Sequence, residues 1–150
     1  MGMPGERRLD RPPSERYLIE PEAPTPLTGS TMRALGAGLA AALGWSLATI
    51  LFGGVLAVSL GLLVLAAAFG RLIALAVAWG GGSGLAAGPR LAIALATVVD
   101  GFLVGQFGVW AYGRLEGGVL APVEYVMTTF GIVVPLQLLV ALGVAWWTAR

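Results

Sequence analysis

The sequence contains no cysteine, no histidine and no lysine. Without cysteine there is no disulfide and no thiolate that could act as a nucleophile or metal ligand. The lack of histidine removes the commonest metal ligand and the usual general base. All nine basic residues are arginines and the formal net charge is +1, a balance that gives no basis for binding nucleic acid. We therefore expect no metal, no cofactor and no nucleic-acid partner.

Charged residues are also scarce, at 11% of the 150 residues, whereas hydrophobic residues make up 57%. Soluble domains carry about 25% charged residues, which cover a surface in contact with water. The composition therefore predicts an integral membrane protein whose main partner is the lipid bilayer. Arginine as the sole basic residue, with abundant alanine, glycine and valine, is typical of GC-rich bacterial genomes. We therefore expect the bacterial cytoplasmic (inner) membrane as its location.

Residues 1–32 differ from the rest of the chain, because they hold six of the nine prolines and nine charged residues of mixed sign. Such a segment cannot bury enough apolar surface to fold alone. We expect a disordered cytoplasmic tail, either a solvated leader or a docking segment for a partner. No apolar run follows its first arginines for more than twenty positions, so the tail does not resemble a signal peptide. The membrane domain is then residues 33–150.

Two helices are expected in the first apolar stretch, residues 34–79, where Arg71 is the only charge. As one helix this stretch would be about 69 Å long, although a bilayer core of ~30 Å needs only ~20 residues. The paired glycines Gly53 and Gly54 favour a turn between two spans, which predicts helices at 33–52 and 55–79. The alternative is one long tilted span followed by an interfacial helix that carries Arg71.

Two further helices are expected after a glycine-rich segment at 80–89. We interpret that segment as a flexible loop, because it lacks the Gly-Lys-Ser/Thr ending of a phosphate-binding loop. A third helix fits 90–113. Pro122 suits the first turn of a fourth helix over 122–147, and Pro135 inside it predicts a kink. The predicted fold is an all-α bundle of four transmembrane helices.

The orientation follows from the arginines that flank these helices. If the N-terminus is cytoplasmic, Arg33, Arg90 and Arg150 all lie on the cytoplasmic side, as the positive-inside rule requires. The outer loops then carry Arg114 against Glu116 and Glu124. We therefore predict that both termini are cytoplasmic.

Asp100 and Arg71 are the charged residues expected within the membrane. Asp100 lies ~15 Å along its helix from Arg90, and Arg71 lies ~12 Å from Trp79. Both would be near mid-bilayer, where an isolated charge is costly. We predict either a buried ion pair, which the planar guanidinium group of Arg71 could make with two hydrogen bonds, or an Arg71 side chain that snorkels to the headgroups.

Gln137 and Ser46 are expected at a similar depth, so that Arg71, Asp100, Gln137 and Ser46 would form one polar layer. The layer could fix the register of the helices or serve transport or proton relay. At 100° per residue, Gln106 points about 120° away from Asp100, and we expect it outside this layer. Small residues recur every four positions at Thr97, Gly101 and Gly105. They predict close helix packing, either within the chain or between copies.

Three segments resemble parts of uncharacterised small polytopic bacterial membrane proteins. The first, Phe69-Gly-Arg-Leu-Ile-Ala-Leu-Ala-Val-Ala-Trp-Gly-Gly-Gly, resembles a glycine-rich hairpin that leads into a cytoplasmic turn. The others are Glu116-Gly-Gly-Val-Leu-Ala-Pro-Val-Glu-Tyr and the C-terminal Trp146-Trp147-Thr-Ala-Arg. Together they cover less than half of the chain, and Arg90 stands alone where the turn usually carries a basic cluster. The resemblance implies no activity, and no functional residue is carried over.

The functional prediction is a non-catalytic accessory or scaffold subunit that contacts other membrane subunits or further copies of itself. The alternative is a small oligomeric transporter or channel with Asp100 in its path. An intramembrane enzyme is disfavoured, because the carboxylates outside the tail are Asp100, Glu116 and Glu124. The two glutamates lie about half a bilayer from Asp100, too far for a catalytic carboxylate pair.

Overall fold

The computed structural model describes residues 27–56, 58, 60–118 and 120–150. Nearly all of these residues are helical and none is in a strand, which confirms the all-α prediction. The elements are α2 (Leu27–Thr49), its π-helical continuation η1 (Ile50–Val55), α3 (Gly61–Gly81), the short turn η2 (Gly82–Gly84), α4 (Ala87–Leu115), α5 (Pro122–Phe130) and α6 (Val133–Ala149). The predicted tail lies outside the described residues as far as residue 26, and its last six residues already belong to α2.

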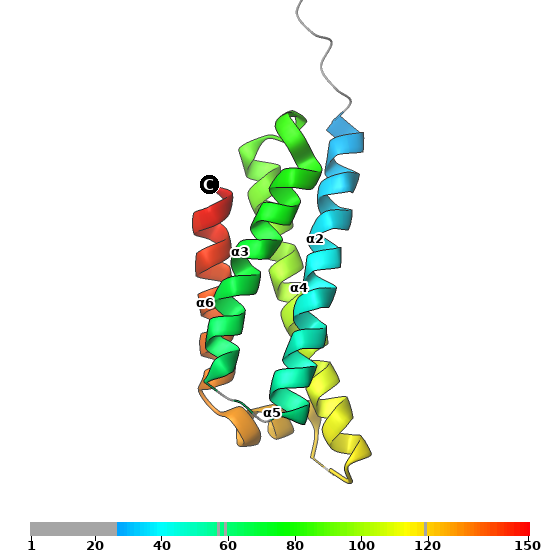
Figure 1. Ribbon diagram of the computed structural model, residues 1–150, viewed down its shortest axis with the longest axis vertical. Coiled ribbons are helices and arrows are strands. Elements are labelled where there is room, and N and C mark those ends of the chain that lie inside the picture. The colour runs from blue at the N-terminus through cyan, green and yellow to red at the C-terminus, as the bar shows by residue number, and fades with distance from the viewer. Residues whose placement is uncertain (1–26, 57, 59, 119) are drawn as a thin grey trace, which may run out of the picture.

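Four of these helices form an up-and-down bundle, and α5 lies across one end of it (Figure 1). Helices α2 and α4 run in one direction, and α3 and α6 run in the other. Both α2 and α6 pack against α3 and α4, and no contact joins α2 to α6 in the described part of the chain. Helices α3 and α4 therefore face each other across the short diagonal of the bundle, and their outer faces point in opposite directions.

Glycines allow the helices to approach closely at several levels. A Cβ atom on Gly70 of α3 would collide with the backbone of Ala141 on α6. A Cβ atom on Gly80 would lie 2.6 Å from the carbonyl oxygen of Arg33 on α2. Without a hydrophobic driving force between helices in lipid, such close backbone packing is a main source of helix association.

Three helices are long and apolar enough to cross a membrane: residues 30–55, 61–84 and Ala87–Leu115. A fourth span exists only if α5 and α6, which are bent by 91° at their junction, count as one. The predicted membrane class is thus supported, but the predicted single fourth helix over 122–147 with a kink at Pro135 is wrong. The bend falls at Gly131, whose φ of 55° is left-handed, and not at Pro135. Pro135 lies in the first turn of α6, where its missing N–H has no helical partner to lose.

The predicted break at Gly53-Gly54 is also wrong, because the helix continues through both glycines as η1. A Cβ atom on Gly53 would lie 3.5 Å from Leu62 and Val109, and one on Gly54 would lie 3.4 Å from the ring of Tyr112. A Cβ atom at either position would thus make ordinary van der Waals contacts with α3 and α4, and the turn to α3 comes after Val55. The expected helices at 33–52 and 55–79 become Leu27–Val55 and Gly61–Gly81.

The predicted glycine-rich loop at 80–89 is shorter than expected. Helix α3 continues through Gly81, and α4 begins at Ala87, three residues before the predicted start at Arg90. Between them Leu85 is only 6% exposed and packs against Gly81. The segment between α3 and α4 is thus anchored to the bundle by the buried side chain of Leu85.

Candidate functional site

The interior of the bundle contains one side-chain hydrogen bond between glutamines of different helices. The Nε2 atom of Gln106 on α4 donates to the Oε1 atom of Gln137 on α6 at 3.1 Å. Gln137 is fully buried, Gln106 is 9% exposed, and the Nε2 atom of Gln137 has no hydrogen-bond partner among the described residues. Gln137 was predicted to lie in the polar layer, but its partner Gln106 was not.

Ser46 links α2 to α4 within the same interior. Its Oγ atom lies 2.9 Å from the carbonyl oxygen of Gly101 and 3.0 Å from that of Ala42. The backbones are close here, because a Cβ atom on Gly101 would lie 3.0 Å from that of Ala42. Gly105 lies against Ser46 and Thr49 in the same way. The predicted packing stripe on α4 therefore lies between helices of one chain.

Thr97 completes that stripe. Its hydroxyl group hydrogen-bonds to the carbonyl oxygens of Ile93 and Ala94 in its own helix, at 2.8 and 3.0 Å. Its methyl group faces Gly38 of α2, where an added Cβ atom would lie 3.1 Å away. Thr97 therefore packs its methyl group into the α2–α4 contact, and its hydroxyl group makes its hydrogen bonds within α4.

Arg71 and Asp100 do not join this interior. Both side chains are exposed, and no ion pair links them in the part of the chain that the structure describes. The reason is helix rotation: Gly70, Ile73 and Ala74 face the core from α3, while Val98 and Gly101 face it from α4. The predicted ion pair within one chain is therefore not formed, although α3 and α4 are neighbours as expected.

The position of Asp100 is energetically unusual. It lies close to the midpoint of α4, a helix long and apolar enough to cross a membrane. A carboxylate that faces lipid at that depth costs about 2.5–3.5 kcal/mol on insertion scales. Residues in such positions normally face the inside of a bundle or another polar group, and here α4 turns Asp100 outward.

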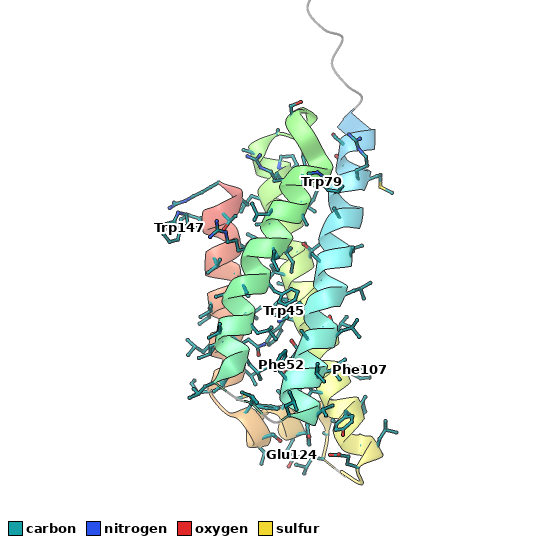
Figure 2. All side chains as sticks on the ribbon, viewed as in Figure 1. Trp45, Phe52, Trp79, Phe107, Glu124 and Trp147 are labelled. Carbon is teal, nitrogen blue, oxygen red and sulfur yellow. The ribbon has the colours of Figure 1, made fainter. Side chains whose placement is uncertain are left out.

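An apolar groove lies between α4 and α5, with one residue of α6 at its border. Its volume is about 540 Å³. The lining is apolar apart from Gln106, and comprises Phe102, Leu103, Val104, Gln106, Phe107, Pro122, Val123, Val126, Met127 and Val134. Leu103, Val104 and Phe107 follow Asp100 by three, four and seven residues, so they share its helix face. Figure 2 shows Phe107 near the lower end of α4 and Trp45 near the centre of the bundle.

The described residues contain no group of three or more histidine, cysteine, aspartate or glutamate side chains that could hold a metal ion. Comparison of the chain with protein-family models, with curated proteins and with solved structures finds no match. The assignment of a function therefore depends on the placement of the polar side chains alone.

The two glutamines should contribute unequally to stability. Replacing Gln106 with leucine leaves Gln137 fully buried with neither end bonded, and an unsatisfied buried polar group costs about 1–3 kcal/mol. Replacing Gln137 with methionine leaves Gln106 beside the groove, and should cost less. The double variant should recover part of the loss in a double-mutant cycle of unfolding free energies in detergent. Additive losses would contradict an energetic role for this hydrogen bond.

Proposed function

We propose that the protein crosses the bacterial cytoplasmic membrane four times, with α6 as the fourth span and α5 lying in the outer interface. Helix α6 is about 26 Å long, near the lower limit for a span. Its C-terminal Arg150 lies 4.1 Å from the ring of Trp146, and at the other end of the bundle Arg114 lies 5.9 Å from the ring of Trp110. Aromatic residues at both ends are typical of membrane interfaces.

The proposed topology can be tested by labelling single cysteines, because the native chain has none. Ser83→Cys and Arg150→Cys should react with an impermeant maleimide only after the cells are opened. Glu124→Cys, in the exposed first turn of α5, should react from outside intact cells. Labelling of Arg150→Cys and Glu124→Cys from the same side would show that α6 does not cross the bilayer.

We further propose that the protein is a non-catalytic subunit that associates sideways with other membrane chains. The observation that carries this proposal is Asp100, which points outward from the middle of α4. A carboxylate in this position gains most when another chain supplies a donor or a positive charge. The uncharged glutamine pair inside the bundle supports a role in holding the helices together.

The size of the native complex in mild detergent tests this function. The wild type should migrate as an assembly larger than one chain, and Asp100→Asn should shift it toward the single chain. Glu124→Gln removes a carboxylate from an exposed site away from the middle of the spans, so it should leave the assembly unchanged. A wild-type protein that is a single chain in native membranes would refute the proposal.

A further inference from the structure

We propose that the partner on the outer face of α4 is a second copy of this chain, whose Arg71 pairs with Asp100. The inference rests on the function proposed above and names the partner. Arginine suits this role because its planar guanidinium group can bind a carboxylate through two parallel hydrogen bonds. Both side chains are exposed within a single chain and are available to another.

The two charges lie at the same level of the bundle. Asp100 precedes Gly101, whose added Cβ atom would touch Ala42 of α2 at 3.0 Å. Arg71 lies two residues beyond Phe69, whose ring is 3.5 Å from a Cβ atom added on Gly44 of α2. Ala42 and Gly44 are two residues apart, so the charges differ in depth by less than one helical turn of ~5.4 Å. Two copies side by side in one bilayer therefore bring them to matching depth.

Arg71 is exposed on α3 and Asp100 on α4, and these two helices face each other across the bundle. A symmetric pairing of one face with itself would place like charges together. The contact must instead join the α3 face of one copy to the α4 face of the next, which is a head-to-tail arrangement. Such contacts form a ring if the rotation closes, and an open row if it does not.

Apolar side chains surround both charges. Leu72 and Leu75 lie beside Arg71 on α3, and they are 50% and 47% exposed. Leu103 follows Asp100 by one turn on α4 and is 59% exposed. Leu103, Val104 and Phe107, which line part of the apolar groove, share the helix face of Asp100. Contact between the two faces would therefore enclose the ion pair among apolar groups, where a low dielectric strengthens it.

Charge reversal gives a test that includes its own folding control. Arg71→Asp alone places two aspartates across the contact, and Asp100→Arg alone places two arginines there. Each variant expressed alone should lose self-association. Co-expression of the two, with different tags, should restore it, because every contact between unlike copies again pairs an arginine with an aspartate. Recovery of one tag with the other should fall at least tenfold for each single variant and return in the mixture.

Disulfide crosslinking in native membranes locates the contact. A copy with Leu72→Cys and a copy with Val99→Cys should crosslink to each other, and Leu47→Cys on the outer face of α2 should crosslink to neither. Association of the charge-reversed variants at the wild-type level, or no rescue in the mixture, would overturn the inference. If the partner proves to be a different protein, and Asp100→Asn dissociates that complex, then self-association is refuted but the proposed function as an associating subunit is retained. A wild-type protein that is a single chain in native membranes would refute both the self-association and the proposed function.

Discussion

Replacing Gly70 with alanine is expected to destabilise the bundle by about 1–3 kcal/mol, the usual cost of forcing extra atoms into a packed interior. The added Cβ atom would collide with the backbone of Ala141, and a backbone cannot rotate aside as a flexible side chain can. Helices α3 and α6 would have to separate at this level. Leucine at the same position should prevent the packing of α6 altogether.

The matched control is Gly143→Ala in α6, because an added Cβ atom there meets nothing within 4 Å. Alanine at that exposed helical position should stabilise by about 0.5–1 kcal/mol through helix propensity. The same substitution is thus expected to have opposite signs at two glycines. The free energy of unfolding in SDS titrations from mild detergent measures both. Equal effects at Gly70 and Gly143 would contradict the close contact between α3 and α6.

Trp45→Ala is expected to produce the second large loss, about 3 kcal/mol. This is the lower end of the range for truncation of buried aromatic residues in proteins that unfold into water. In a membrane the unfolded chain stays in lipid, so the side chain gains little from transfer out of water on folding, and the loss comes mainly from packing. Trp45 is fully buried, and its ring lies 6.2 Å from that of Phe102. Removing it opens a cavity between α2 and α4 that the neighbouring helices cannot fill.

Trp79→Ala is the control for Trp45, because its side chain is 85% exposed and packs little against the bundle. It should change the unfolding free energy by less than about 0.5 kcal/mol. Trp45→Phe should retain most of the stability, since the indole Nε1 atom has no hydrogen-bond partner among the described residues. A loss for Trp45→Phe as large as that for Trp45→Ala would show that the indole N–H is satisfied by a group such as water.

The helices could be predicted from apolar runs, but their ends depended on the role of each glycine. Gly53 and Gly54 carry the same sequence signal as a turn, yet they lie inside a continuous helix against α3 and α4. Gly131, a single glycine without a neighbouring proline, lies at the 91° bend between α5 and α6. A glycine can either end a helix at a turn or lie inside a helix where another helix packs against it. The neighbouring helices decide between the two, so the local sequence alone does not.

The interior contacts were partly predictable from helix periodicity. The small residues Thr97, Gly101 and Gly105 mark the face of α4 that meets α2, and Asp100 lies 100° from Gly101, turned away from the core. The missed residue, Gln106, belongs to a second buried stripe with Phe102 and Val109, and its own side chain hydrogen-bonds to Gln137 of α6. Comparing Gln106 with this second stripe, and not with Asp100, would have placed it inside. The prediction considered only one packing face of α4, whereas α4 packs against both α2 and α6.

The unequal lengths of the helices have a consequence for the bilayer itself. Helix α4, with 29 residues, is about 43 Å long, whereas α6, with 17 residues, is about 26 Å long. If both cross the membrane, α4 must tilt or extend beyond the bilayer core, while the lipid beside α6 thins to match the shorter span. The protein should then favour thin membranes, and copies in contact would share one thinned patch. Longer acyl chains would raise the cost of each isolated copy and so drive the copies together.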